Sequence, residues 1–410
     1  MYGVLFVADR PPRGDWPETV ETFMRNIEGD ASALGIQLIR GGNVLTSNGN
    51  EDNLHSNLGK MLKGGARIVV VILGSDSYAI VKKVGDSLGV PTQCLKWKNV
   101  EKTPRGYYAN VMLKMNTKMG GTNHTLMSRA PAPAAKFQDP PNSLNWLFDK
   151  PTMLVGIDLS REPGTDNESM VAVVASMDGK ASQYHAFLSM QSSRDEMVRG
   201  LEAEMVKAFE TFKSRNRVMP AHVIVYRDGV SEGQFDAVIR DELPEIKNAI
   251  ALMGSTEDDV KVSIVICQKR HHTRVVYKET SADGTTIINP CPGLVVDATG
   301  GANSIASANF NEFYLNSHAA IQGTSKPCKY SLIYDDIGFK LSELELLTYW
   351  LCYLYCRANK SVSYASPAYY AHWASQRCRI LVSAGATSVD LSQISEKWRE
   401  KGRVSSMFFV

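Results

Sequence analysis

The sequence predicts an α/β protein with two domains, and three observations support this fold class. The chain has 410 residues, which is enough for two or three domains of roughly 100 to 200 residues each. Residues 67–73 form a short apolar run rich in β-branched side chains, which is typical of a parallel strand covered on both faces. Between residues 152 and 226, three strand-like runs are followed by an amphipathic helical segment and a fourth strand.

The composition excludes several classes of protein. Hydrophobic residues make up 44% of the chain and charged residues 21%, with a formal net charge of +2, which excludes disorder, collagen and coiled coil. Seven cysteines, an odd number spread along a long chain, predict reduced thiols rather than a disulfide framework. We therefore expect an intracellular protein, cytoplasmic with the nucleus as the alternative. No apolar run reaches the length of about 18 residues that a membrane span needs, and no signal peptide is visible.

In the first domain, the strand at 67–73 leads into a helix predicted at 79–88, whose first backbone amides could face an anion. Between residues 77 and 118, eight basic residues stand against two acidic ones, a local excess that predicts binding of a polyanion. A second basic segment lies at 268–274. One basic cluster alone would be interpreted as a solvated surface, but two clusters with aromatic residues among them favour nucleic acid.

A segment rich in proline and alanine separates the two domains. We place the first domain at 1–128, the linker at 129–144 and the second domain at 145–410. The second domain begins with strand-like runs at 152–158, 170–176 and 184–190, and the short turns between them predict antiparallel neighbours. A helix follows at 193–212 and a strand at 222–226. Further strands are predicted at 262–267 and 330–334, and a long helix at 342–356.

Two of the predicted strands end in carboxylates, Asp158 and Asp228. If the strand at 222–226 lies parallel to the one at 152–158, both side chains emerge at the same edge of the sheet. Two adjacent carboxylates repel each other, and a divalent cation between them relieves the repulsion. Mg²⁺, or alternatively Mn²⁺, would suit such a site and the two-metal displacement at phosphorus. The alternative is that each aspartate is an ordinary turn or cap residue.

Several motifs closely resemble the Piwi domain of eukaryotic Argonaute proteins: residues 226–235, 268–274, 317–325 and 367–372. Residues 78–86, 92–94 and 113–121 resemble the Mid domain of the same family. The resemblance covers nearly the whole chain, and it implies a Rossmann-like Mid domain followed by a ribonuclease H-like Piwi domain. The N-terminal and Paz domains of the family find no match, so we expect the C-terminal half of a longer protein. The apolar end of the chain resembles a family terminus that packs inside.

The resemblance also implies a catalytic tetrad of Asp158, Glu196, Asp228 and His372, in which Asp158, Asp228 and His372 hold the metal. Glu196 has an alternative explanation, because Ser193 and Glu196 match a helix capping box. His372 taken alone would be a packed or a surface histidine. Beside the two aspartates it is a plausible imidazole ligand.

The resemblance assigns the pocket for the 5′ phosphate of a guide RNA to Tyr78, Lys82, Gln93, Lys114, Lys118 and Arg377. A terminal phosphate carries nearly two negative charges, and ammonium, amide and phenol groups supply charge-assisted hydrogen bonds to it. Tyr78 could also stack on the first base. The alternative for the lysines is ordinary surface charge. Weaker matches assign the guide backbone to Lys269, Arg270, His318, Gln322, Lys326 and Tyr369.

The function implied by the resemblance is RNA silencing guided by a small RNA. A monomer would bind a guide RNA with a 5′ phosphate, and the full-length protein would cleave complementary target RNA as a Mg²⁺-dependent endoribonuclease. The alternative is a guide-RNA-binding module that does not cut and silences by recruiting partner proteins. A nuclease acting on DNA through the same kind of site is a third and more remote interpretation.

Overall fold

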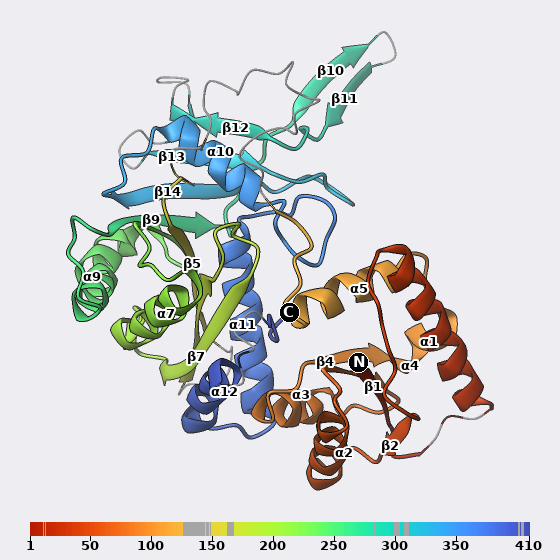
Figure 1. Cartoon of the computed structure of the whole chain (residues 1–410). Helices are drawn as coiled ribbons and strands as arrows, with labels where there is room; N and C mark the ends of the chain where they lie inside the picture. Colours follow the sequence, from red (N-terminus) through yellow and green to blue (C-terminus); the bar gives the residue numbers. More distant parts are fainter. Residues whose placement is uncertain are drawn as a thin grey trace. The chain divides into compact units, whose positions relative to one another are not determined.

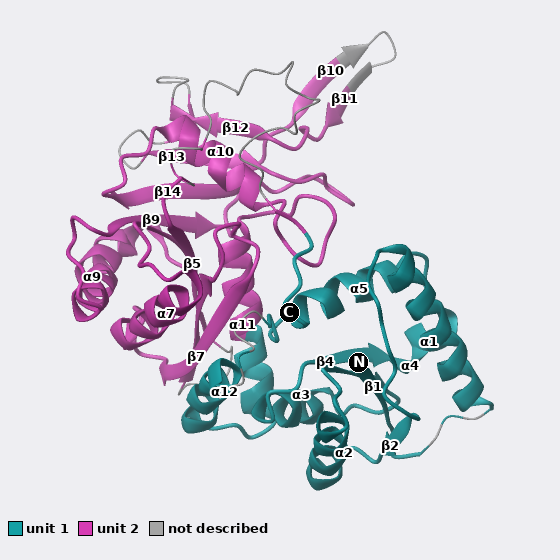
Figure 2. Cartoon of the chain, in the orientation of Figure 1, with its two compact units in different colours: residues 1–123, 376–410 teal, residues 124–375 magenta. Residues whose placement is uncertain are grey.

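The structure is a computed structural model, and it describes residues 1–10, 12, 14–125, 144, 147, 149–161, 168–281, 284–298, 304–306, 311–400, 402 and 406–410. The predicted linker at 129–144 lies outside the described residues except for its last position. The chain forms two compact units (Figure 2). Unit 1 contains Met1–Asn123 and Gln376–Val410, and unit 2 contains His124–Ser375. The domain boundaries inferred from the sequence stay predictions.

Unit 1 is built on a parallel sheet with the strand order β2-β1-β3-β4 (Figure 1). Its strands are β1 (Tyr2–Val7), β2 (Leu45–Ser47), β3 (Ile68–Leu73) and β4 (Thr92–Lys96). Its first helices are α1 (Trp16–Ala33), α2 (Glu51–Lys63), α3 (Tyr78–Ser87), α4 (Trp97–Lys102) and α5 (Tyr107–Lys118). The predicted strand at 67–73 and the predicted helix at 79–88 are confirmed, and so is the Rossmann-like arrangement.

The sequence of β3 explains why this sheet is covered on both faces. All six of its residues are apolar and buried, and successive side chains of a strand point to opposite faces. Ile68, Val70 and Ile72 belong to the core under α1, α4 and α5. The residues between them belong to the core under α2 and α3. The side chains of this uninterrupted apolar strand are therefore buried on both faces of the sheet, as expected in a parallel sheet.

Unit 2 contains an eight-stranded sheet with the order β12-β13-β14-β9-β8-β5-β6-β7. The strands are β5 (Thr152–Arg161), β6 (Glu168–Ser176), β7 (Tyr184–Ser192), β8 (His222–Asp228), β9 (Lys261–Gln268), β12 (Leu294–Asp297), β13 (Glu312–Asn316) and β14 (Cys328–Asp335). A separate hairpin pairs β10 (Tyr277–Ser281) with β11 (Gly284–Ile288). As predicted, β5, β6 and β7 are antiparallel neighbours, and β8 is parallel to β5.

The helices of unit 2 lie on both faces of this sheet. They are α7 (Leu201–Asn216), α9 (Leu243–Leu252) and α10 (Leu341–Leu351), with the short helical turns η2 (Glu232–Gln234), α8 (Phe235–Ala237) and η3 (Val238–Glu242). Helix α11 (Ser366–Ser383) begins in unit 2 and ends in unit 1, where α12 (Ser388–Glu400) follows. Among the described residues, no helix combines the length and the apolar character that crossing a membrane requires.

Two predicted helix boundaries were wrong. The helix predicted at 193–212 begins only at Leu201, because the amides of Val198 and Arg199 donate to the side chains of Glu242 and Gln191 instead of to a helix. No helix begins at Ser193, so the capping-box interpretation of that segment is also wrong.

The helix predicted at 342–356 ends at Leu351. The carbonyl of Cys352 accepts from Val362, and the amide of Cys356 donates to the Tyr370 hydroxyl. Both groups therefore have partners outside the helix. The side chains of Cys352 and Cys356 are both buried and pack in the core of unit 2.

The end of the chain packs inside unit 1, as expected. Residues Met407 to Val410 are buried, and the Phe408 ring stacks on Trp398 with 4.9 Å between the ring centroids. The Ser406 hydroxyl donates to the carbonyl of Lys118, the last residue of α5. The terminal segment therefore supports the helix that carries two of the predicted guide-binding lysines.

Candidate functional site

The two candidate aspartates lie opposite each other on adjacent strands. Parallel pairing of β5 with β8 places Asp158 directly beside Asp228. Only 5% of Asp158 and 6% of Asp228 is exposed. Along β8 the side chains alternate in direction, so that Tyr226 and Asp228 face α10 and α11 while Arg227 faces the opposite side. The predicted placement of the two aspartates at one edge of the sheet, on neighbouring parallel strands, is confirmed.

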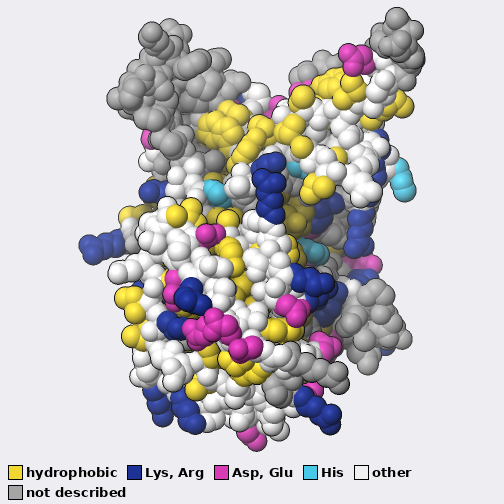
Figure 3. All heavy atoms as spheres, turned by 90° about the vertical axis from the view of Figure 1, so that its right-hand side faces the viewer, with side chains coloured by type: hydrophobic (Ala, Val, Ile, Leu, Met, Phe, Trp, Pro, Cys, Tyr) yellow, Lys and Arg dark blue, Asp and Glu magenta, His cyan; other side chains and the backbone are white. Residues whose placement is uncertain are grey.

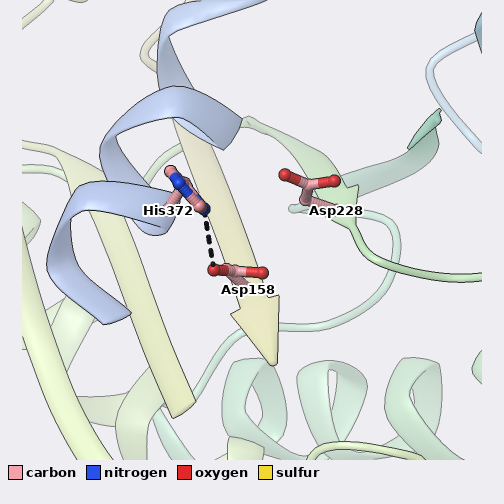
Figure 4. A group of neighbouring side chains, drawn as sticks. All are labelled: Asp158, Asp228 and His372. Atoms are coloured by element: carbon pink, nitrogen blue, oxygen red, sulfur yellow. Dashed lines mark ion pairs between the residues drawn. The ribbon is translucent and has the colours of Figure 1, made fainter. Parts of the chain in front are cut away.

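His372 completes a group of three possible metal ligands (Figure 4). It projects from α11 toward the two aspartates, and its Nδ1 atom lies 3.6 Å from Oδ2 of Asp158. One ligand atom from each of the three residues lies within 4.8 Å of the others. In the part of the chain that the structure describes, this is the one such group of three or more residues.

A glycine allows α11 to reach this position. A Cβ atom at Gly156, two residues before Asp158 on β5, would lie 1.9 Å from the carbonyl oxygen of Pro367. That distance is far inside van der Waals contact, so only glycine fits between the strand and the first turn of the helix. Pro367 precedes His372 by five residues on the same helix. The close approach therefore brings the imidazole over Asp158.

The environments of the two aspartates shift their pKa values in opposite directions. Burial acts to raise the pKa of Asp158, but the nearby imidazole of His372 and the hydrogen bond from the Ser375 hydroxyl outweigh it and lower the pKa. Burial raises the pKa of Asp228, and the nearby charge of Asp158 adds to this, while Lys269 opposes it. The Lys269 ammonium lies 2.6 Å from Oδ2 of Asp228.

The three side chains fit a divalent cation. The two carboxylates are the hard oxygen donors that suit Mg²⁺ or Mn²⁺, and the imidazole can add one nitrogen donor to them. The repulsion between the carboxylates contributes to the raised pKa of Asp228, and a bound cation would remove this effect. The predicted metal could therefore be held by Asp158, Asp228 and His372.

Glu196 lies outside this group. It sits in the segment before α7, its side chain is exposed, and its Oε2 atom accepts a hydrogen bond of 2.8 Å from Nε2 of Gln234. Its catalytic role stays a prediction.

In unit 1, three basic side chains predicted to hold a phosphate are buried together. The exposed fractions of Lys82, Lys118 and Arg377 are 1%, 3% and 3%. Lys82 donates to the carbonyl and the hydroxyl of Thr92 at 2.7 and 2.9 Å. Lys118 donates to Oε1 of Gln93 at 2.8 Å. These cations do not belong to an ordinary charged surface such as the face in Figure 3, where basic and acidic side chains are interspersed.

The charges of these residues act on one another. Burial is the largest cause that lowers the pKa of Lys118, and the positive charges of Lys82, Arg377 and Lys114 lower it further. Tyr78 is partly exposed at the start of α3, and its ring centroid lies 5.6 Å from the Lys82 ammonium. A phosphate would relieve the mutual repulsion of these cations. The structure therefore brings together Tyr78, Lys82, Gln93, Lys114, Lys118 and Arg377.

The residues assigned to the guide backbone differ from one another in burial and in contacts. Lys269 contacts Asp228, and Tyr369 stacks between Tyr355 and Tyr364. His318 is partly buried, whereas Arg270, Gln322 and Lys326 are exposed. The guide contacts of these residues stay predictions.

Sequence reasoning missed two residues that support the site, namely Gly156 and Ser375. The Ser375 hydroxyl donates to Oδ2 of Asp158. Its position three residues after His372 places it on the same side of α11, and this spacing was the one signal that could have identified it.

Comparison with known proteins identifies the class that this fold and site define. Residues 68–382 match the family model of the Piwi domain, and the chain belongs to this family. It also has the fold of the C-terminal part of Argonaute proteins, as three solved structures show. The C-terminal lobe of a budding yeast Argonaute matches with a TM-score of 0.84 and 22% identity, over 100% of this chain and 85% of that one.

The Kluyveromyces polysporus Argonaute with a guide RNA matches with a TM-score of 0.84 and 24% identity, over 100% of this chain and 51% of that one. The MID-PIWI domains of QDE-2 from N. crassa match with a TM-score of 0.62 and 22% identity, over 100% of this chain and 97% of that one. The chain thus spans about half the length of the K. polysporus protein. The ribonuclease H-like fold predicted for the Piwi domain is confirmed.

Proposed function

We propose that this protein binds the 5′-phosphorylated end of a small guide RNA and carries a divalent-metal site that cleaves complementary RNA. The observation that carries the cleavage proposal is the group of Asp158, Asp228 and His372 at one edge of a Piwi-family sheet. The guide proposal is supported by the buried cations of unit 1. A structure of similar fold is described with a guide RNA.

The residues of the site divide the chemistry between them. A bound Mg²⁺ would supply an activated water and neutralise charge on the scissile phosphate. The hydrogen bond from the Ser375 hydroxyl and the nearby imidazole of His372 favour the ionised form of Asp158, which is the form that binds a metal. Asp228 and His372 would complete the donor set. Hydrolysis would leave a 5′ phosphate and a 3′ hydroxyl on the products, and Glu196 would act as the fourth polar residue.

The cleavage proposal is tested with Asp228→Asn. We expect this variant to lose Mg²⁺-dependent cleavage of a guide-paired target RNA and to retain guide binding, because Asp228 belongs to unit 2 whereas the cations predicted to hold the guide phosphate belong to unit 1. Asp258→Asn is the control, since its side chain is 98% exposed in unit 2. Undiminished cleavage by Asp228→Asn would refute the assignment.

The guide proposal is tested by comparing one RNA with a 5′ phosphate and with a 5′ hydroxyl. We expect a preference for the phosphate that Lys82→Ala and Lys114→Ala both weaken, because each removes a charge-assisted contact. Lys83→Ala is a matched control, because Lys83 is the next residue of α3 and its ammonium pairs with Glu51. If both RNAs bind equally well to the unaltered protein, the pocket assignment is wrong.

One observation favours a second candidate function, a guide-binding module that recruits partner proteins and does not cut. The exposed side chain of Glu196 lies outside the ligand group, which leaves three of the four predicted catalytic residues together. Phosphate-dependent guide binding without any cleavage would support this candidate.

We also propose that the protein is intracellular. The seven cysteines are all free thiols, and this supports the proposal.

A further inference from the structure

Lys269 occupies an unusual position for a residue next to a metal site. It directly follows β9, the strand beside β8, whose last residue is Asp228. Its Nζ atom lies 2.6 Å from Oδ2 of Asp228 and 3.6 Å from the centroid of the Tyr364 ring. A carboxylate and an aromatic face both attract an ammonium group. These two contacts hold the charge of Lys269 against the candidate metal ligands.

The ammonium and a metal ion would compete for the same carboxylate. The charge of Lys269 acts on Asp158 as well as on Asp228, so it lies within electrostatic reach of both acidic ligands. A divalent cation bound between them would meet this fixed positive charge, and repulsion at a few ångströms is strong where water is excluded. The two aspartates are almost fully buried, so water screens the repulsion poorly.

Lys269 can also leave this position. Its side chain is 29% exposed, and a lysine carries its charge on a flexible four-carbon stem. A nucleic-acid strand at the site would bring phosphates, which are strong acceptors for an ammonium group. A phosphate could therefore withdraw the ammonium from Asp228 without any movement of the backbone.

We propose that Lys269 is a built-in counter-ion that competes with the divalent metal for Asp228, and that a phosphate of the bound RNA releases it. This inference rests on the proposed function. It means that the metal site is weakened in the free protein and is strengthened when RNA is bound. By thermodynamic linkage, the metal increases the affinity for RNA by the same factor.

The test is the Mn²⁺ affinity of the full chain without RNA, measured by electron paramagnetic resonance. We expect Lys269→Met to bind Mn²⁺ about tenfold more tightly than the unaltered protein, a size typical of removing one nearby charge. Lys269→Arg keeps the charge and should not show this gain. Lys261→Met is the matched control, because Lys261 lies at the other end of β9 and pairs with the exposed Asp258.

A second measurement adds a single-stranded RNA with a 5′ phosphate. This RNA should increase the Mn²⁺ affinity of the unaltered protein, and it should have little effect on Lys269→Met. This measurement does not depend on the folding of a variant, because the increase in Mn²⁺ affinity is expected in the unaltered protein itself. Unchanged or weaker Mn²⁺ binding by a folded Lys269→Met variant would overturn the inference and make Lys269 a residue that only orients Asp228.

Failure of this inference can be distinguished from failure of the proposed function. Asp158→Asn removes a ligand, and it should abolish the Mn²⁺ site whatever Lys269 does. If Asp158→Asn does not change Mn²⁺ binding, the metal site itself is wrongly assigned and the inference falls with it. If Asp158→Asn abolishes binding but Lys269→Met leaves it unchanged, the metal site stands and only the role of Lys269 is refuted.

Discussion

At the scale of single residues, Gly156 controls the distance between the strand of Asp158 and the helix of His372. We expect Gly156→Ala to destabilise the protein by about 1 to 3 kcal/mol, the usual cost of overpacking, because the new methyl group would overlap the carbonyl of Pro367. The shift of α11 should also weaken Mn²⁺ binding. Chemical denaturation and Mn²⁺ titration check the two effects.

Gly179→Ala is the matched control for this prediction. No atom lies within 4 Å of a Cβ built at Gly179, so the same chemical change meets open space in the same unit. Equal stability of the two variants would show that α11 can move away from β5 at no cost.

Residue patterns predicted the aspartates of the site but not their supporting contacts. Asp158 and Asp228 could be found because each follows a run of strand residues, so their position follows from local structure. Ser375 and Asp158 are 217 positions apart, and their hydrogen bond depends on how a helix packs on a sheet. Lys269 was assigned to the guide backbone from its motif, and nothing in the sequence indicated its contact with Asp228.

At the scale of elements, a buried ion pair joins β8 to the helical turn before α9. Arg227 donates two hydrogen bonds to Oε1 and Oε2 of Glu242 at 2.8 and 2.9 Å, and both side chains are almost fully buried. The Oε1 atom of Glu242 also accepts a hydrogen bond from the backbone amide of Val198, which is close to Glu196 in sequence. The pair therefore connects the strand of Asp228 with the segment that carries the predicted fourth catalytic residue.

We expect Glu242→Gln to destabilise the protein by about 3 kcal/mol, because it leaves the buried charge of Arg227 without its partner. Urea unfolding measures the change. Asp241→Asn is the control, since Asp241 is the adjacent residue and its ion pair with Arg240 lies on the surface, where such pairs contribute little. A Glu242→Gln variant as stable as the control would contradict this account of β8.

The contact between α10 and β12 makes us expect that the stability of the protein depends on pH. Glu345 of α10 lies near Asp297, the last residue of β12, and burial together with the charge of Asp297 raises the pKa of Glu345 to about 7. In the unfolded chain this pKa is near 4.5, so the folded state binds the proton more tightly. The pair therefore destabilises the fold above pH 7, and this effect fades as the pH falls from about 7 toward 4.5.

Glu345→Gln should remove this effect. We expect the variant to be more stable than the unaltered protein at pH 8 and to differ little from it at pH 5. Denaturation midpoints at the two pH values test this expectation. A difference between the proteins that does not change with pH would show that Glu345 is ionised at both values in the folded state.

Elements were predicted well where their own residues determine them. The apolar run of β3 and the three antiparallel strands could be recognised locally, and the crossover to a parallel β8 followed from them. The start of α7 could not be predicted, because Glu242 lies 44 positions from the Val198 amide that it binds. Helical periodicity cannot reveal that this amide donates its hydrogen bond to a side chain that is distant in sequence.

At the scale of the whole molecule, the chain returns to unit 1 after forming unit 2. Residues 376–410 pack with 1–123, and Arg377 of α11 pairs with Asp86 of α3 at 2.8 Å across 291 positions of sequence. A family motif predicted that Arg377 would join the phosphate pocket, whereas local patterns contain no sign of this contact. The pairing allows two explanations: Arg377 could neutralise Asp86, or it could bind the guide phosphate.

Arg377→Gln separates these explanations when it is combined with Asp86→Asn. We expect Arg377→Gln to reduce the preference for a 5′ phosphate over a 5′ hydroxyl about tenfold, the size of one charge-assisted hydrogen bond, and to lower the stability because Asp86 stays buried and unpaired. The double variant should regain stability but not the preference. Arg25→Gln, in an exposed ion pair with Glu18 on α1, should change neither. Full recovery of the preference in the double variant would mean that Arg377 serves only Asp86, and the phosphate pocket would then consist of residues from α3, β4 and α5 alone.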